Sequence, residues 1–386
     1  MRTSNRLPVL LALMALVLTA WSPARAGAAT PTVATPTVAG LRVVAAPSVA
    51  GPKVAGPKVA SGFAILVDAQ TGTVLWTRHA TTARAPASLT KMLTALLVRA
   101  SLRLDTVAVA GRDAAKTPAN KLALKPGQKI MVSQALAALM VVSANDMAVL
   151  LADRTAGSVR RFERAMNLAS TRLGLRQSSW HSPNGLDAPA HRSSAFDLAI
   201  LARAVLHDPW LAKLVRMDRV VFTTPDLHRH ELYAHSRFLK EYRGAVGIKT
   251  GFTDDAGRCL AAAATRKGRT LIAIVLRSRD PAADATQLMN WGFGSGRSAR
   301  TGRVLPPYVA VPSVHALLAP APTTTVAPTT TSPVQAATSD ALGQRISRWR
   351  EDRRIPVGIG ASAGVVLLAG SGLVVRRRRR RTVTPG

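Results

Sequence analysis

The chain has 386 residues, of which 47% are hydrophobic and 4% aromatic, and its formal net charge is +32. This length and apolar content indicate one core of about 250 residues with appendages and argue against three separate domains. The excess of basic residues, 52 Lys and Arg against 20 Asp and Glu, raises nucleic-acid binding as a first hypothesis. Basic and aromatic residues do not alternate along the chain, as nucleic-acid binding would favour. Both ends of the chain also carry patterns typical of targeting segments, which predict a domain outside the cytoplasm. We therefore expect no nucleic-acid partner.

The first 26 residues have the three-part layout of a secretory signal. Arg2 and Arg6 precede an apolar run over 7–21, and the sequence Ser-Pro-Ala-Arg-Ala, with small residues suited to cleavage, follows it over 22–26. This pattern predicts a signal peptide over 1–26 and export of the mature chain. Over 27–60, repeats such as Val-Ala-Gly-Pro-Lys contain too few large apolar side chains for a core, so this range predicts a flexible low-complexity leader.

The folded unit is expected over 61–305. Two short apolar segments, 63–67 and 73–77, flank Asp-Ala-Gln-Thr-Gly and predict a β-hairpin. Helical periodicity predicts helices, and later apolar runs predict strands. The expected helices cover 88–100, 133–156, 158–173 and 195–205, and the expected later strands cover 257–264 and 270–277. Strands at both ends of the unit, with helices between them, predict an α/β fold in which an antiparallel sheet carries a helical cluster.

The C-terminal part has a different composition. Residues 306–345 are rich in Pro, Thr, Ala and Val, which predicts an extended linker. The uncharged stretch over 355–375 has about the length of a helix that crosses a hydrocarbon core. Six arginines follow it over 376–381, and such residues stay on the cytoplasmic side. We expect one transmembrane helix over 355–375, a cytoplasmic tail over 376–386 and a folded unit outside the cell membrane.

The segment Ala-Pro-Ala-Ser-Leu-Thr-Lys ends in a lysine three residues after a serine. Residues three apart in a helix share a face, with about 5–6 Å between their Cβ atoms, so Ser88 and Lys91 can converge. A serine hydroxyl needs an adjacent base to become a nucleophile. A lysine is a base only where burial or a neighbouring cation lowers its pKa. The pattern therefore requires a second positive charge close to Lys91.

Two further segments carry polar groups at unexpected places. The sequence Ser-Ala-Asn at 143–145 interrupts an apolar run, and Lys-Thr-Gly at 249–251 places a cation, a hydroxyl and a glycine on an expected strand edge. With Ser-x-x-Lys, these segments form the signature of penicillin-binding proteins and serine β-lactamases. Their flanks, and Ser-Pro-Asn-Gly-Leu-Asp at 182–187, resemble the D-alanyl-D-alanine carboxypeptidase family over about 61–295.

The resemblance implies roles for residues of all three motifs. Ser88 would be the acylated nucleophile, Lys91 its base and Ser143 a proton relay. The backbone N–H groups of Ser88 and Phe252 would form the oxyanion hole. The substrate would be held by four residues: Asn145, Lys249, Thr250 and Gly251. Lys249 would also supply the second positive charge.

The resemblance also implies the fold, the reaction and the partners. The fold would be that of penicillin-binding proteins and serine β-lactamases, with the site between sheet and helical cluster. The reaction would remove the terminal D-alanine of peptidoglycan stem pentapeptides through an acyl-enzyme, without a cofactor. Partners would be the stem peptide, β-lactams as covalent inhibitors, and the membrane through the C-terminal helix.

Two alternatives share the same motifs. A catalytically weak scaffold would hold stem peptides in the same cleft, and a β-lactamase would hydrolyse penicillin rapidly. The sequence Glu163 to Asn167 imitates the glutamate–asparagine pattern of one β-lactamase class. Phe162, Met166 and Leu173 form an apolar stripe there, so we interpret the pattern as an ordinary amphipathic helix.

Two other features invite a chemical interpretation. His228, His230 and His235 are close in sequence, but their spacing lacks the paired histidines and glutamate of a zinc protease helix, and we expect no metal site. Cys259 is the only cysteine, so it forms no disulfide within the chain. Its apolar flank predicts a buried strand position rather than a nucleophile.

Overall fold

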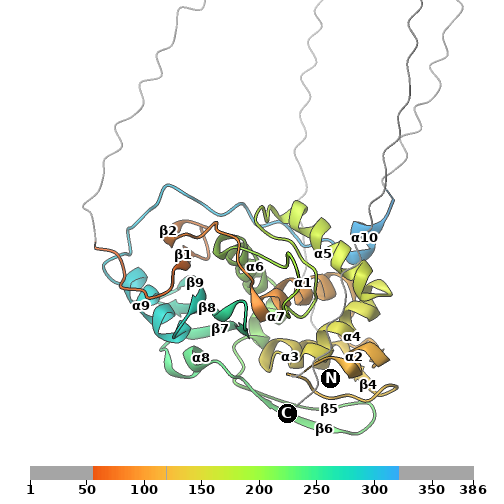
Figure 1. The fold of residues 1–386 in the computed structure, drawn as a ribbon. Coiled ribbons are helices and arrows are strands. Elements are labelled where there is room, and N and C mark those ends of the chain that lie inside the picture. Colours follow the sequence, from red (N-terminus) through yellow and green to blue (C-terminus); the bar gives the residue numbers. More distant parts are fainter. Residues whose placement is uncertain (1–54, 119, 321–386) are drawn as a thin grey trace, which may run out of the picture. The chain divides into compact units, whose positions relative to one another are not determined.

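The computed structural model describes residues 55–118 and 120–320 (Figure 1). The expected signal peptide, most of the leader, the transmembrane segment 355–375 and the basic tail lie outside the described residues, as does the linker beyond residue 320. Within the described ranges, none of the helices combines the length and the apolar character that a membrane span needs.

A five-stranded antiparallel sheet is the largest sheet in the described part of the chain. Its strand order is β2-β1-β9-β8-β7, so strands from both ends of the folded unit lie side by side (Figure 1). The strands are β1 (Phe63–Asp68), β2 (Val74–Arg78), β7 (Ala245–Thr253), β8 (Gly257–Arg266) and β9 (Arg269–Ser278). The expected sheet built from both ends is confirmed, and β7 lies at one edge.

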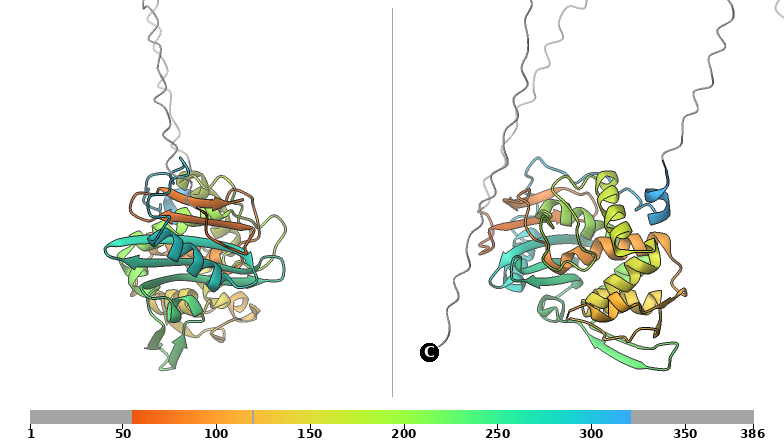
Figure 2. Two further views of the ribbon diagram at one scale, coloured as in Figure 1. Left: turned by 90° about the vertical axis from the view of Figure 1, so that its left-hand side faces the viewer. Right: turned by 45° about the vertical axis from the view of Figure 1, so that its right-hand side comes forward.

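Both faces of this sheet are buried. Leu66 of β1 packs in a cluster with helix α9 (Pro281–Phe293), whereas its neighbour Ile65 packs with the helical cluster. Successive strand residues point to opposite faces, so a sheet covered on both sides requires continuous apolar runs. The run Leu271–Leu276 of β9, entirely buried, meets this requirement. Figure 2 (left) shows the sheet from the α9 side.

Five longer helices form a cluster on the other side of the sheet and build most of the core, with α6 packed directly on the sheet. They are α1 (Lys91–Ser101), α3 (Val132–Val141), α4 (Asn145–Ala156), α5 (Val159–Leu173) and α6 (Ala195–His207). Ser158 and Ser194 cap α5 and α6 by accepting backbone N–H groups, which serine does well. The range 133–156 forms two helices rather than one, because Ser143 between them has a φ of 63°.

Smaller elements complete the described fold, and the sequence analysis did not predict them. Strand β3 (Val107–Val109) pairs with β4 (Lys129–Met131), and β5 (Arg219–Thr223) pairs with β6 (Arg229–Tyr233). The short helices are α2 (Arg112–Lys116), α7 (Pro209–Leu214) and α8 (Arg237–Glu241). The β5–β6 hairpin lies beyond α3, at the bottom of Figure 1.

The folded part extends beyond the expected range of 61–305 on both sides. Helix α10 (Val314–Leu318) packs on the helical cluster, with Val314 buried and its N–H donated to Ser101 Oγ at 2.9 Å. A helix therefore lies inside the range expected to be an extended linker. At the other end Val59 is buried in the α9 cluster. Hydrogen bonds add to this packing, because Arg78 donates to the carbonyl of Val59 at 2.6 Å. Each extension places few large apolar side chains in the core, which is too small a signal to stand out in low-complexity sequence.

Candidate active site

Ser88 lies in a short 3-10 turn, η1 (Ala87–Thr90), directly before α1. The turn begins with Ala87 at φ 48°, in the left-handed region that is costly for an alanine. Ser88 is half-buried, and its Oγ lies 2.9 Å from Nζ of Lys91, the first residue of α1. The expected convergence of these two side chains is present, in a 3-10 turn rather than an α-helix.

Lys91 Nζ has three oxygen neighbours, and a neutral amine can satisfy all of them. Besides Ser88 Oγ, the nitrogen has Asn145 Oδ1 at 2.7 Å and the backbone oxygen of Asn184 at 2.5 Å. These two oxygens only accept hydrogen bonds, whereas a serine hydroxyl can also donate. A neutral amine has two N–H bonds and one lone pair. It can therefore donate to Asn145 and Asn184 while its lone pair accepts the Ser88 proton, which is the arrangement of a base on its nucleophile.

Burial lowers the pKa of Lys91 well below its usual range. The residue is fully buried, and the second cause of the lowered pKa is the charge of Lys249, opposed by that of Asp146. Lys249 is also buried, and burial lowers its own pKa to about 7. Lys249 is therefore the neighbouring cation that the Ser-x-x-Lys pattern was expected to require. Burial of Lys91 is nevertheless the larger cause.

The second motif lies at the junction of α3 and α4. Ser143 takes the left-handed conformation there, and Asn145 begins α4 with its side chain buried against Lys91. The Asn145 N–H donates to the carbonyl of Asn120 at 2.7 Å, and Asn120 Nδ2 donates to the carbonyl of Val142 at 2.6 Å. The motif therefore brings a loop asparagine to the site, which the sequence analysis did not assign.

The loop before α6 supplies another group that the sequence analysis did not assign, the carbonyl of Asn184. Ser182 Oγ accepts the Asn184 N–H at 3.2 Å, and Thr94 Oγ1 donates to the carbonyl of Pro183 at 2.6 Å. The first bond lies within the loop and the second attaches the loop to α1, with the Asn184 carbonyl at Lys91. A backbone carbonyl has no side-chain signature, so only the Ser-Pro-Asn-Gly sequence could have pointed to it.

Gly185 packs so closely on the nucleophile turn that we expect its substitution to be costly. Its φ is 83°, and a Cβ there would lie 2.0 Å from the carbonyl oxygen of Ala87. Gly185→Ala should lower the free energy of unfolding by about 3 kcal/mol, because a backbone clash adds to the left-handed penalty. Gly157→Ala is the matched control, since Gly157 has φ 79° with no atom within 4 Å. It should lose only about 1 kcal/mol. Equal losses in urea unfolding would contradict this expectation.

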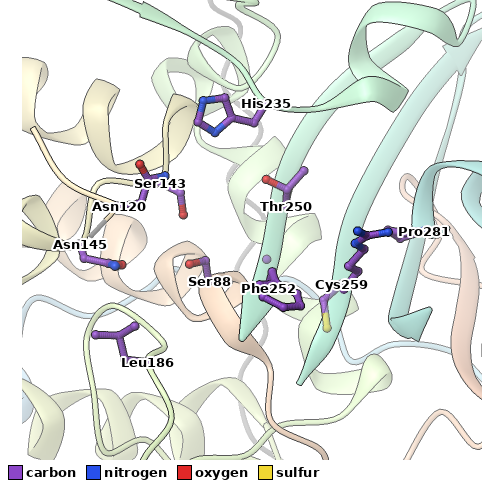
Figure 3. A pocket seen from close by; sticks show the side chains of 12 residues that line it. Ser88, Asn120, Ser143, Asn145, Leu186, His235, Thr250, Phe252, Cys259 and Pro281 are labelled. Atoms are coloured by element: carbon purple, nitrogen blue, oxygen red, sulfur yellow. The ribbon is translucent and has the colours of Figure 1, made fainter. Parts of the chain in front are cut away.

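Strand β7 brings the third motif alongside Ser88. The Lys249 side chain is buried, and its Nζ donates to the carbonyl of Thr250 at 2.9 Å. A Cβ on Gly251 would lie only 3.0 Å from the backbone nitrogen of Ser88, so a glycine lets the strand approach the turn. Thr250 and the exposed Phe252 lie on the strand side of the site (Figure 3).

A cleft of about 490 Å³ joins these groups (Figure 3). It is lined by Ser88, Asn120, Ser143, Asn145, Leu186, His235, Thr250, Gly251, Phe252, Arg258, Cys259 and Pro281. All three motifs contribute residues to this one cleft, while the two lysines are buried behind it. The arrangement places a hydroxyl and its base opposite a strand edge, where a peptide can lie.

Glu163 is not among the residues that line this cleft. It lies on α5, where Phe162 and Met166 face the core. The Asn167 side chain donates to the carbonyls of Glu163 and Trp180, at 2.9 and 2.8 Å. The glutamate–asparagine pattern at this position therefore belongs to the packing of α5, as we interpreted it.

Cysteine and histidine often act as nucleophiles or metal ligands, so the surroundings of Cys259, His230 and His235 need description. Cys259 is a buried residue of β8, and burial raises its thiol pKa to about 11. His230 lies on β6, and His235 lines the cleft. Over 55–118 and 120–320, no group of three or more His, Cys, Asp or Glu residues is placed to hold a metal ion.

Solved structures resemble this fold. A crystal structure of D-alanyl-D-alanine carboxypeptidase from Mycobacterium tuberculosis superposes with a TM-score of 0.60 at 29% identity, over 65% of this chain and 97% of that one. The DD-transpeptidase of a Streptomyces strain gives a TM-score of 0.59 at 32% identity, over 62% of this chain and 99% of that one. The expected α/β fold of the penicillin-binding protein type is confirmed.

Relatives found by sequence are also D-alanyl-D-alanine carboxypeptidases. D-alanyl-D-alanine carboxypeptidase DacF of Bacillus subtilis is 30% identical over 238 residues, which are 60% of this chain and 61% of that protein. DacA of Escherichia coli is 34% identical over 59% of this chain and 60% of that protein. The chain thus spans about three fifths of the length of these two relatives. The profile of the D-alanyl-D-alanine carboxypeptidase family matches residues 50–280, and the chain belongs to that family.

Proposed function

We propose that this chain is a serine-type D-Ala-D-Ala carboxypeptidase that removes the terminal D-alanine from peptidoglycan stem pentapeptides and is acylated by penicillin. The observation that carries the proposal is the fully buried Lys91 Nζ, which lies 2.9 Å from Oγ of the half-buried Ser88 on the lining of the cleft. The family relationship supplies the substrate class.

Acylation begins with Ser88. The Lys91 amine takes its proton, and Oγ attacks the carbonyl carbon of the penultimate D-alanine. The negative charge on the carbonyl oxygen is stabilised by the backbone N–H groups of Ser88 and Phe252, and preorganised donors of this kind contribute about 3 kcal/mol each. The proton returns to the leaving D-alanine amine through Ser143, which lines the same cleft.

The other end of the leaving group is a carboxylate. Lys249 in its charged form and the Thr250 hydroxyl bind it, because charge-assisted hydrogen bonds to carboxylates are strong. Asn145 holds the Lys91 amine and the substrate backbone. Water then attacks the acyl-enzyme, with Lys91 again as the base, and releases the shortened peptide.

Release of D-alanine tests the proposal. The purified chain should release D-alanine from a pentapeptide that ends in D-Ala-D-Ala and leave a D-Ala-L-Ala control intact. Penicillin should add its whole mass to the protein and block the release. A scaffold would bind the pentapeptide without releasing D-alanine, and a β-lactamase would hydrolyse penicillin rapidly and leave the pentapeptide unchanged. Either result would reject the assignment.

The two lysines give the reaction an expected pH dependence. Lys91 must be neutral to act, so kcat/KM should rise with pH through its lowered pKa. Lys249 must be charged to bind the carboxylate, so kcat/KM should fall as pH rises above about 7. Because the two groups interact, the measured values belong to the pair. Lys249→Arg keeps its charge to high pH and should remove the alkaline limb. D-alanine release from pH 5 to 10 measures both, and an alkaline limb unchanged in Lys249→Arg would contradict this role.

The proposal includes the location of the domain. The composition of 1–26 supports export through a cleaved signal peptide, and the apolar segment 355–375 followed by arginines supports a single membrane anchor. A tether between residue 320 and that segment would hold the domain on the outer side, next to its substrate. Fractionation of cells that produce the chain with and without 355–386 tests this: the full chain should be in the membrane and the truncated one should be released.

A further inference from the structure

A chain of hydrogen bonds connects His191 to the turn that carries Ser88. The backbone N–H of His181 donates to His191 Nδ1 at 3.0 Å, and His191 Nε2 lies 2.9 Å from Thr90 Oγ1. Thr90 Oγ1 in turn donates to the carbonyl oxygen of Ala87 at 2.8 Å. Thr90 is completely buried and His191 is 5% exposed, so water does not compete for these bonds.

The proton positions in this chain follow from its two ends. His181 offers a backbone N–H, so Nδ1 of His191 is an acceptor and the proton of the neutral ring is on Nε2. Thr90 has a single hydroxyl proton, which goes to Ala87, so its oxygen must accept from His191. Both ends therefore require the same tautomer. Burial, with the charge of His181 as a second cause, lowers the His191 pKa to about 4, which keeps the ring neutral at neutral pH.

The carbonyl at the end of the chain shares a peptide unit with the Ser88 N–H. A trans peptide is planar, and its C=O and N–H point in opposite directions. A bond that fixes the Ala87 carbonyl therefore fixes the direction of the Ser88 N–H. This control matters because Ala87 is held at φ 48°, a conformation that an alanine leaves when nothing holds it. Gly251 of β7 lies on the N–H side, where a Cβ would be 3.0 Å from Ser88 N.

We propose that His191 is a positioning residue for the acylation of Ser88: through Thr90 it holds the Ala87–Ser88 peptide so that the Ser88 N–H is aimed at the oxyanion. The inference rests on the proposed function and adds to it a residue outside the three motifs. His191 does not touch the substrate. Its loss should slow formation of the acyl-enzyme and leave the initial, non-covalent binding unchanged.

The test is penicillin acylation of the full chain by stopped-flow with a fluorescent penicillin, which separates the non-covalent dissociation constant from the acylation rate constant. His191→Leu and Thr90→Val should each lower the rate constant by about tenfold, with unchanged dissociation constants, because a misaligned donor costs less than the loss of one. His191→Gln should stay within about threefold of the wild type, since an amide can accept at its oxygen and donate from its nitrogen. The double variant should be no slower than the single ones, because both substitutions break one chain of bonds.

Ser170→Ala controls for general destabilisation of this region. Ser170 Oγ accepts the indole N–H of Trp180, which is packed against the His191 ring, but it takes no part in the chain to Ala87. This variant should lose thermal stability and keep the wild-type acylation rate. Three results would overturn the inference alone: normal acylation of His191→Leu, additive losses in the double variant, or equal slowing by Ser170→Ala. A wild-type chain that penicillin does not label would overturn the proposed function and the inference together.

Discussion

Ser88→Ala is expected to abolish both D-alanine release and covalent labelling by penicillin. The hydroxyl is the group that forms the acyl-enzyme, and removing a serine nucleophile typically costs on the order of 10⁶ in rate. Ser88 is half-buried at the cleft, so its loss should leave the melting temperature nearly unchanged. Mass spectrometry after incubation with penicillin, and an assay for free D-alanine, measure the two losses.

Ser298→Ala is the matched control for this substitution. Ser298 is an exposed serine in the segment after α9, and it does not line the cleft. Its alanine variant should turn over and be labelled like the wild type. A Ser88→Ala protein that still released D-alanine or still gained the mass of penicillin would mean that another residue is the nucleophile.

Lys91→Met is expected to slow acylation by about 10³- to 10⁴-fold. Methionine has a similar length but no amine, so the Ser88 proton loses its acceptor, and general-base catalysis contributes up to about 10⁴-fold. The substitution also leaves Asn145 Oδ1 and the Asn184 carbonyl without the donor that the structure gives them. A buried group without its partner costs about 1–3 kcal/mol, so the melting temperature should fall as well.

Lys240→Met separates the chemistry of Lys91 from the removal of a lysine in general. Lys240 is exposed on α8, outside the cleft, and its variant should acylate at the wild-type rate. Single-turnover acylation by penicillin is the measurement for both variants. If Lys91→Met kept more than about a tenth of the wild-type rate, Lys91 would not be the base.

The sequence predicted the parts of the site that have a chemical reason to be polar. Ser88 and Lys91 share a face at a spacing of three, and polar residues inside an apolar run, as at 143–145, require partners in the fold. The sheet could be expected for a similar reason. Residues 271–276 are apolar without alternation, which indicates a strand covered on both faces, as β9 is.

Other parts of the site could not be read from the sequence because the backbone supplies them. The position of the Asn184 carbonyl and the left-handed conformations of Ala87 and Ser143 depend on tertiary contacts. An alanine or a serine in the sequence does not predict a positive φ. His191 gave no signal either, since its role depends on a partner 101 positions away. Helix α10 has only five residues in a segment rich in Pro, Thr, Ala and Val, so the composition of that segment hid it.

Cys259 also decides how this protein can be labelled for spectroscopy. It is the only cysteine of the chain, it is 2% exposed, and its thiol pKa of about 11 leaves roughly one molecule in 10⁴ as thiolate at pH 7. Maleimide dyes react with thiolates, so they will leave the native cysteine almost untouched. A single cysteine introduced on the surface would therefore carry the dye alone, and the wild-type background needs no mutation near the cleft.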